Sequence, residues 1–226
     1  MPDGDTRLLL FPLPDVVHFP RTELRLHILE PRYRRLVRDV SAMDEESRWI
    51  GVVTIKPGPR LDAEGRPEVF PGGTAARVLD IEEQPDGSHV VLHGEFRFEL
   101  QRELDEPPHR QALVRPVEEP WLNERDAGIV AVRKRVLDLL RSLSAELGES
   151  FPLSGEDIDE LADCFFEELI NRIAASVDVP PLRKLQLLTE PLPERGLSVL
   201  SILRSRRQVM DLLRPFRRLA DGSELN

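Results

Sequence analysis

Paired histidines and isolated nucleophiles are the residues of this sequence whose types could do chemistry. His89 and His93 lie four residues apart, and the imidazole nitrogen is a common ligand of zinc. On a strand that rises about 3.3 Å per residue, however, their side chains are separated by about 13 Å, which is too far for one ion. The other histidines, His18, His27 and His109, are scattered and have no neighbouring cysteine. We therefore expect no metal site.

The candidate nucleophiles are equally isolated. Ser142 and Lys184 would suit a serine–lysine dyad, but Ser142 lies inside a regular amphipathic pattern that offers no exposed turn. Cys164 has no histidine near it in sequence and lies beside apolar positions, where a free cysteine usually acts as a small buried hydrophobe. The chain also lacks the Gly-x-Ser-x-Gly pattern and any Gly-Lys pair of a phosphate-binding loop. We predict no catalytic residue, no cofactor and no enzymatic activity.

Two charged motifs lie next to aromatic residues. The segment Glu30-Pro31-Arg32-Tyr33-Arg34 could offer a charged edge to a partner. The structural alternative, which we favour, is that Glu30 and Arg32 cap a helix and pair with the adjacent strand while Tyr33 packs. Arg97 lies between two phenylalanines, and alternate residues of a strand point to opposite faces. We expect Arg97 to form a structural ion pair rather than to contact a ligand.

Recognition of other proteins would require an exposed apolar groove, and three large aromatic residues are candidates to line it. They are Trp49, Phe70 and Trp121, although a place in the core suits each of them better. We expect such a groove between a β half and a helical half, or beneath the loop from Lys56 to Gly73, where eight of eighteen residues are Pro or Gly. An open sheet edge that accepts an extended peptide is the alternative.

Residues 1–120 have the pattern of a β-rich half. Alternation of polar and apolar residues, interrupted by Gly and Pro, predicts strands, and the apolar face that follows Glu30 predicts one helix with Pro31 in its first turn. Several short strands of this kind indicate a barrel or a strongly curved sheet. The predicted strands are Leu8–Phe11, Glu23–Ile28, Trp49–Ile55, Thr74–Glu83, Val90–Leu92, Phe96–Leu100 and Gln111–Val117.

After Pro120 the apolar period changes from two to about 3.6, which predicts helices. Gly148 follows the first apolar stripe as a helix stop, and Ser154 precedes the second as a cap with an acid three residues on. The sequence therefore predicts an α+β protein, with a β subdomain over residues 1–120 and a four-helix bundle over residues 121–226. The four predicted helices are Ile129–Leu147, Ile158–Ile173, Leu182–Leu188 and Glu194–Arg214.

The charge balance limits the kinds of partner that the protein can bind. The chain of 226 residues carries 31 basic and 41 acidic side chains, a net charge of −10. Residues 1–120 hold 16 of the basic and 23 of the acidic residues, a net charge of −7. This opposes contact with nucleic-acid phosphates. No apolar run approaches the roughly 20 residues needed to cross a bilayer, and the N-terminus lacks a signal pattern. We expect a cytoplasmic protein that binds neither nucleic acid, membrane nor metal.

Three N-terminal motifs, in their order and spacing, resemble the opening of the substrate-recognition domain of the ATP-dependent Lon protease family. They are Leu10-Phe11-Pro12-Leu13, Val17-His18-Phe19-Pro20 and the segment from Leu26 to Arg34. Gly73–Val78 and Gly94–Phe98 resemble later signatures of that domain, and Leu185–Glu190 with Arg195 resembles its closing helices. The resemblance covers about residues 7 to 214.

The resemblance implies a PUA-like β pseudobarrel with one packed helix, followed by a helical bundle, the two together forming one substrate-binding unit. It implies binding of unfolded or client proteins without chemistry of its own. The ATPase and protease modules of full-length relatives do not fit in 226 residues. The sequence therefore predicts a stand-alone bacterial protein, an adaptor that links clients to a protease or to protein quality control.

Two other classes stay open at this point. An RNA-binding PUA-like module is suggested by the shape of the implied pseudobarrel, but the acidic β half makes a poor surface for RNA. A hydrolase would need a convergent catalytic site, which spacing along the sequence cannot reveal.

Overall fold

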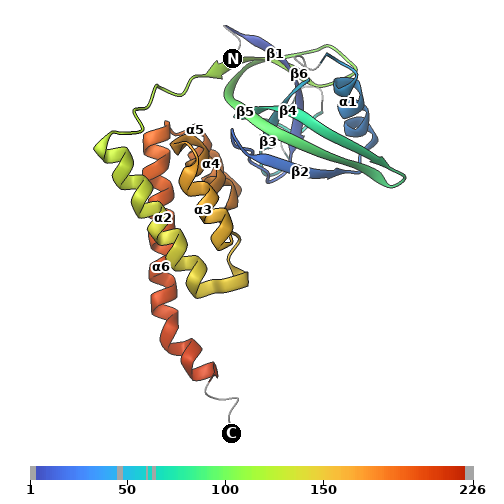
Figure 1. Cartoon of the computed structure of the whole chain (residues 1–226). Helices are drawn as coiled ribbons and strands as arrows, with labels where there is room; N and C mark the ends of the chain where they lie inside the picture. Colours follow the sequence, from blue (N-terminus) through green and yellow to red (C-terminus); the bar gives the residue numbers. More distant parts are fainter. Residues whose placement is uncertain (1–3, 45–47, 60, 63–64, 222–226) are drawn as a thin grey trace. The chain divides into compact units, whose positions relative to one another are not determined.

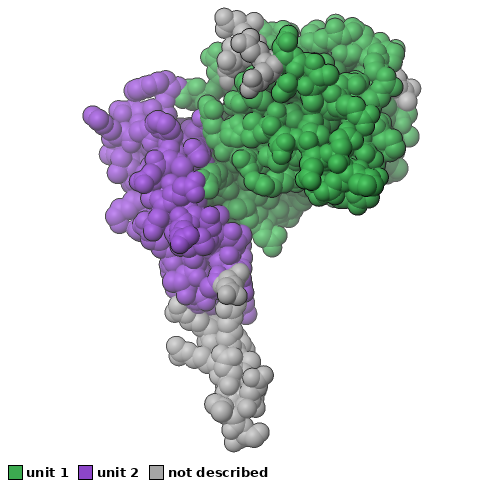
Figure 2. All heavy atoms as spheres, turned by 45° about the vertical axis from the view of Figure 1, so that its right-hand side comes forward, with its two compact units in different colours: residues 1–120, 171–190 green, residues 121–170, 191–226 purple. Residues whose placement is uncertain are grey.

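The computed structural model describes residues 4–44, 48–59, 61–62 and 65–221 (Figure 1). Within them the fold is α+β, with a six-stranded sheet and six α-helices. The chain divides into two compact units, which Figure 2 colours separately. The first comprises residues 1–120 and 171–190, and the second residues 121–170 and 191–226. The structure thus groups residues 171–190 with the β half, whereas the sequence pattern places them with the helical half.

The strands of the first unit pair in the order β2-β5-β4-β3-β1-β6, and β5 also pairs with β6. Five strands therefore close into a ring, while β2 pairs, among the described strands, with β5 alone. Figure 1 shows β4 and β5 as the two longest strands, which run side by side. The strands are β1 (Thr6–Leu13), β2 (Glu23–Ile28), β3 (Trp49–Ile55), β4 (Val69–Gln84), β5 (Gly87–Leu104) and β6 (Gln111–Val117).

Two apolar clusters stabilise this sheet from its two faces. Strand alternation separates them on β1, where Leu8 and Leu10 belong to one cluster and Phe11 to the other. The cluster of Phe11 also contains Leu36 and Val40 of the helix α1 (Pro31–Ser41), so that α1 packs on one face of the sheet. All five side chains are at most 4% exposed.

Strand β5 corrects the sequence prediction, because Val90–Leu92 and Phe96–Leu100 are parts of one continuous strand. The pairing of β5 with β4 shifts register on the two sides of Gly94, which is the irregularity that the glycine predicts. A Cβ atom at Gly94 would lie 2.2 Å from the carbonyl oxygen of Phe19. β5 continues past Gly94 because glycine leaves room for the main chain of Phe19, which passes close to it.

The loop after β3 is shorter than the sequence predicts. β4 begins at Val69, which pairs with Ile55 of β3, so Phe70 lies in a strand instead of in an irregular loop. Leu61 and Pro67 form an isolated bridge within the remaining loop. Residues 60, 63 and 64 of the predicted loop lie outside the described part of the chain.

The described chain contains five α-helices after residue 120, one more than the sequence predicts. The predicted helix Ile158–Ile173 is two helices, because the backbone at Cys164 is extended (φ −73°, ψ 161°). None of the helices among the described residues has the length and apolarity required to cross a membrane. The helices are α2 (Ala127–Leu147), α3 (Gly155–Asp163), α4 (Phe166–Ser176), α5 (Pro181–Thr189) and α6 (Leu192–Asp221).

The break between α3 and α4 has a physical cause in the second unit. The main-chain N–H of Phe166, at the start of α4, donates to Glu124 Oε1 at 2.8 Å. Arg133 donates to the carbonyl oxygen of Cys164 at 2.8 Å and forms an ion pair with Glu124 at 2.8 Å. These contacts satisfy main-chain groups that a continuous helix would have paired internally. The sequence pattern does not contain this information, since Glu124 lies 42 residues before Phe166.

Two sequence predictions about helix ends are confirmed. Ser154 forms a capping box with Asp157, since each side chain accepts from the main chain of the other residue. Gly148 follows the last residue of α2 and has a positive φ of 53°, a conformation that favours glycine.

Candidate functional site

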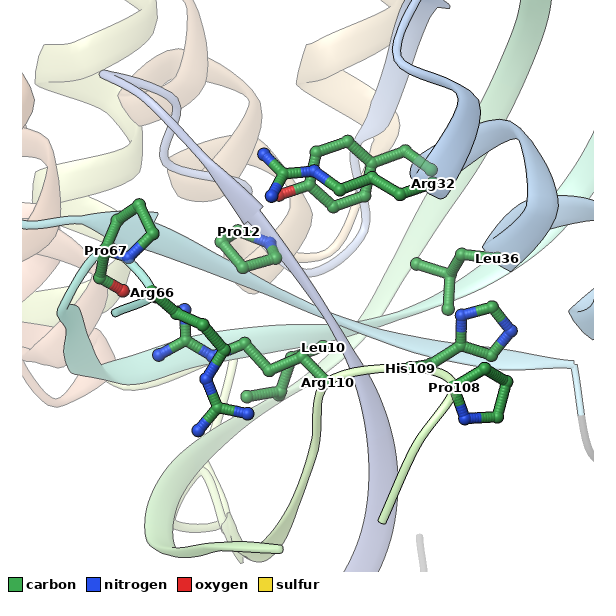
Figure 3. Close-up of a pocket in the computed structure, with 10 residues that line it drawn as sticks. Leu10, Pro12, Arg32, Leu36, Arg66, Pro67, Pro108, His109 and Arg110 are labelled. Carbon is green, nitrogen blue, oxygen red and sulfur yellow. Dashed lines mark hydrogen bonds between the residues drawn. The ribbon is translucent and has the colours of Figure 1, made fainter. Parts of the chain in front are cut away.

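A cavity of about 180 Å³ in the first unit lies where the start of α1 faces β1 (Figure 3). Leu10 and Pro12 of β1 contribute one wall, and Tyr33 and Leu36 of α1 contribute another. The remaining lining comes from two loops, through residues Arg66 and Pro67 and through residues 108–110. Because Arg66 and Pro67 end the Pro/Gly-rich loop, the cavity lies at one of the two places that the sequence suggests for a groove.

Tyr33 forms a fixed aromatic surface in this cavity. Its ring packs against Phe11 with the centroids 4.9 Å apart, and the guanidinium of Arg32 lies 4.6 Å from its centroid. Burial raises the pKa of Tyr33 above its ordinary value, so the phenol stays neutral at physiological pH. Arg32 itself pairs with Glu30 at 2.7 Å.

Two arginines at the opposite side of the cavity are neutralised by two acids. Arg110 makes a bidentate contact with Glu103 at 2.8 and 2.7 Å, and Arg66 donates to Asp62 at 2.8 Å. Burial alone would raise the pKa of Asp62, but hydrogen bonds from the main chain and side chain of Arg66, with the charges of Arg66 and Arg110, hold that pKa below its ordinary value. Arg110 also donates to the carbonyl oxygen of Pro67 at 2.7 Å. The network is therefore a rigid support, not a cluster of uncompensated positive charge.

His109 completes the lining through a contact with α1. Its Nε2 lies 2.7 Å from Asp39 Oδ2. The hydrogen bond with His109 is the main reason that the pKa of Asp39 is held below its ordinary value. This contact ties the loop that carries His109 to the helix that carries Tyr33.

The chemistry available in this cavity is binding. Its lining combines apolar surface from leucine and proline, one neutral aromatic ring and arginines held by acids. Among the residues that the structure describes, the lining contains no Ser, Thr, Cys or Lys side chain that a base could activate as a nucleophile. Pockets for small-molecule ligands usually measure about 300–1,000 Å³. At about 180 Å³, this cavity has room for a single apolar side chain.

A second cavity of the first unit, about 260 Å³, lies beside the end of α5 and is lined in part by Arg97. Arg97 is 5% exposed. Its guanidinium donates to the carbonyl oxygen of Leu188 at 2.7 Å and to that of Glu190 at 3.2 Å, and its Nε lies 2.9 Å from Glu119 Oε1. The predicted structural ion pair is confirmed. Sequence reasoning missed the carbonyl partners, which cap the C-terminal end of α5, because Leu188 lies 91 residues away.

The three aromatic candidates lie in different surroundings. Trp49 is half-buried and packs against Phe96, with the ring centroids 5.3 Å apart. Phe70 is half-buried on β4. Trp121 is 87% exposed, so it does not occupy the core position that its residue type favours. Neither cavity described above is lined by any of the three, and a binding role for them stays a prediction.

His89 and His93 have different neighbours in the structure. His89 stacks on His27 of β2, with the ring centroids 4.4 Å apart. The charge of His93 instead acts on His18, a proximity that the sequence does not indicate. Among the described residues, no group of three or more His, Cys, Asp or Glu side chains is placed to hold a metal ion.

The remaining nucleophile candidates each have a structural contact. Ser142 accepts a hydrogen bond from Arg207 at 2.6 Å, and Lys184 donates to the carbonyl oxygen of Ala175 at 2.6 Å. Burial lowers the pKa of Lys184. Cys164 is half-buried at the break between α3 and α4 and contacts the carbonyl oxygen of Glu160 at 3.4 Å, so it is less buried than the sequence pattern indicates.

The motif at the start of α1 acts differently from its prediction. Glu30 is the N-cap residue, but its side chain makes no cap hydrogen bond and pairs with Arg32. Arg34 and Arg38, one turn apart, make the pairing with the strand, since both contact Glu83 of β4. Hydrogen bonding from Arg38 is the main reason that the pKa of Glu83 is held below its ordinary value. The helix is therefore oriented by Arg34 and Arg38, which its helical period places on one face over β4.

Comparison with known proteins decides the family. The family model of the ATP-dependent protease La (LON) substrate-binding domain matches residues 7–205. The chain belongs to this family. The match is to the substrate-binding domain of Lon and not to its catalytic domains.

Curated relatives of the chain are bacterial Lon proteases. It is 29% identical over 210 residues to Lon protease of Anaeromyxobacter dehalogenans and 25% identical over 209 residues to that of Flavobacterium johnsoniae. Both matches cover 91% of this chain, but 24% and 25% of the relatives. The chain thus spans about a quarter of the length of the proteases it matches.

Solved structures with a similar fold are Lon N-terminal domains. The domain from the Mycobacterium avium complex matches with a TM-score of 0.65 and 18% identity, over 88% of this chain and 98% of that one. The domain from Xanthomonas campestris matches with a TM-score of 0.57 and 23% identity, over 86% and 96% of the two chains. These likenesses extend over both the sheet and the helices.

Proposed function

We propose that this protein recognises protein substrates or partners without chemistry of its own, and that it acts as an adaptor linked to proteolysis or protein quality control. The observation that supports this is the match of residues 7–205 to a substrate-binding domain. Its proposed partners are unfolded or client proteins and a protease, in the cytoplasm. We also propose that the β half is a PUA-like pseudobarrel and that residues 1–120 and 121–226 act together as one substrate-binding unit.

The cavity between α1 and β1 is the proposed site for a client side chain. Its size suits one apolar side chain, and the ring of Tyr33 gives that side chain an aromatic surface. The networks of Arg110 with Glu103 and of His109 with Asp39 hold the walls in place. Little ordering of the site is then needed on binding, which favours affinity.

The experiment is a binding titration with a permanently unfolded protein, reduced and alkylated α-lactalbumin. We expect saturable binding that persists after nuclease treatment. The variant Pro12→Phe places an aromatic ring in the cavity, because Pro12 is buried on β1 and lines it. The added volume should cost about 1–3 kcal/mol of stability, so a cooperative urea transition of the variant is measured beside its affinity. We expect its affinity to fall at least about tenfold, the effect of roughly 1.4 kcal/mol.

The matched control is Thr6→Phe, which adds the same ring to β1 outside both cavities. It should bind the unfolded protein as the unmodified chain does. Absence of binding by the unmodified chain would contradict the proposed function. If Pro12→Phe and Thr6→Phe bind the unfolded protein with equal affinity, this cavity is not the binding site. Capture of RNA alone from the chain's own lysate, with binding lost on nuclease treatment, would favour the RNA-binding alternative.

A further inference from the structure

Two aromatic side chains of the second unit are exposed to a degree that is unusual for their type. Trp121 is 87% exposed and Phe165 is 76% exposed, whereas the adjacent Phe166 is fully buried. The extended backbone at Cys164 separates α3 from α4 at this point, so Phe165 lies outside the apolar stripe that buries Phe166. Large exposed aromatic side chains are enriched in surfaces that bind other proteins.

The segments that carry these two residues are tied together. Glu124, three residues after Trp121, accepts the main-chain N–H of Phe166 at 2.8 Å. Arg133 holds the other side of the junction, since it contacts both Glu124 and the carbonyl oxygen of Cys164 at 2.8 Å. The segment that follows Trp121 and the junction that contains Phe165 are therefore held together by these contacts. A preorganised surface of this kind loses little entropy when a partner binds.

The charge around this junction is mainly negative. Between Arg141 and Arg172 the chain carries nine acidic residues and no Lys, Arg or His. Asp163 is exposed two residues before Phe165, and Asp126 is exposed five residues after Trp121, next to the exposed base Arg125. Arg133, the base at the junction, already contacts Glu124 and main-chain carbonyls. Exposed aromatic groups surrounded by acids complement a partner that is apolar and basic.

We propose that Trp121 and Phe165 form a docking surface for a basic amphipathic segment of a client protein, with leucine-like side chains on one face and lysine or arginine on the others. This inference rests on the proposed function, because it names the class of client segment that the protein selects. RNA and anionic membranes are disfavoured as occupants, since both carry the same sign of charge as the surface. A second copy of this chain is the competing occupant that the experiment must separate.

The probe is a 15-residue peptide of leucine and lysine, with leucine at helical spacing. The protein is the full chain with Trp49→Phe, which leaves Trp121 as its one tryptophan. Docking should shift the emission of Trp121 to the blue, because its ring leaves water. Affinity should fall at least about tenfold from about 50 to about 300 mM NaCl, since exposed charges are screened. An unchanged emission at saturating peptide would overturn the proposal.

Three controls separate the apolar and charged contributions. A peptide of serine and lysine with the same charge should bind at least about tenfold more weakly. The variant Phe165→Ser should lose affinity for the leucine–lysine peptide by a similar factor. Val209→Ser is matched to it, because Val209 is 54% exposed on α6 and its neighbour Arg207 contacts Ser142 near the opposite end of α2 from Arg133. Equal affinity of the two variants, or of the two peptides, would refute the docking surface.

The remaining outcomes distinguish this inference from the proposed function. If unfolded α-lactalbumin binds equally well to the chain with and without Phe165→Ser, while the leucine–lysine peptide fails to bind, the docking surface is wrong and the proposed function stands. Emission of Trp121 that shifts to the blue as protein concentration rises without peptide, together with a dimer in sedimentation, would assign the surface to a second copy and overturn the proposal.

Discussion

His18 should make the stability of this protein depend on pH in the mildly acidic range. His18 lies in the segment that joins β1 to β2; its side chain is buried, and its Nδ1 lies 3.5 Å from Thr22 Oγ1. Since the Thr22 hydroxyl donates its hydrogen to the carbonyl oxygen of Phe19 at 2.7 Å, the hydroxyl accepts from His18, which places the proton on Nδ1. Nε2 is buried and has no hydrogen-bond partner among the described residues. A second proton there would be buried without a partner.

Burial, and second to it the charge of His93, lowers the pKa of His18 from 6.5 to about 4. Below pH 6.5 the unfolded chain therefore binds a proton that the folded chain does not accept until about pH 4. The stabilising effect of the neutral histidine is complete above pH 6.5 and is lost as the pH falls toward 4. At about 1.4 kcal/mol for each tenfold change in proton affinity, the loss is about 2 kcal/mol at pH 5 and about 3 kcal/mol at pH 4.

The assay is urea denaturation at several pH values between 7 and 4.5, for the unmodified chain and for His18→Gln, which cannot take up the proton. From pH 7 to pH 5, the free energy of unfolding of the unmodified chain should fall by about 2 kcal/mol more than that of His18→Gln. Acids elsewhere in the protein contribute equally to both and cancel. Phe19→Leu, at a neighbouring buried site, should lower stability but keep the pH dependence of the unmodified chain.

A difference that stays constant within about 0.5 kcal/mol over this range would refute the reasoning, because it would mean that His18 accepts a proton as readily in the folded as in the unfolded state.

Three further changes test contacts that hold the fold. Gly94→Ala should lower the free energy of unfolding by at least about 2 kcal/mol, because its Cβ would lie 2.2 Å from the Phe19 carbonyl oxygen; an unchanged urea midpoint would contradict this close approach. Arg97→Met should cost about 3 kcal/mol because it removes the ion pair with Glu119, whose side chain is 18% exposed, and the double change Arg97→Met with Glu119→Gln should cost less than the single one in the same measurement. Ser154→Ala removes the capping box of α3 and should cost about 1 kcal/mol; a Gly155→Ala chain, which keeps the cap, is the comparison in thermal unfolding.

The sequence by itself determined the local elements of this protein and its family. Alternation predicted the strands, the change of period after Pro120 predicted the helices, and Ser154 and Gly148 predicted helix ends that the structure confirms. The motifs near the N-terminus predicted the family that the comparison shows. These features are readable because periodicity, caps and motifs depend on residues close together in the chain.

The candidate site was predicted only in part. The sequence drew attention to Arg32 and Tyr33 and to the loop whose end lines the same cavity. It did not associate either with His109 or Arg110, which enter the cavity from a distant loop. The three aromatic candidates were chosen by size and residue type alone, and these properties do not say which way a side chain faces.

Only the tertiary structure decided the features that depend on distant partners. Glu124 divides one predicted helix into α3 and α4 because its carboxylate accepts the main-chain N–H that starts α4. Arg97 caps α5 from 91 residues away and so ties that helix to the β unit. The surroundings of His18 arise in the same way, since the chain folds back past Gly94. A helix or strand pattern records which face of an element is apolar, but long-range packing determines which polar group meets that face.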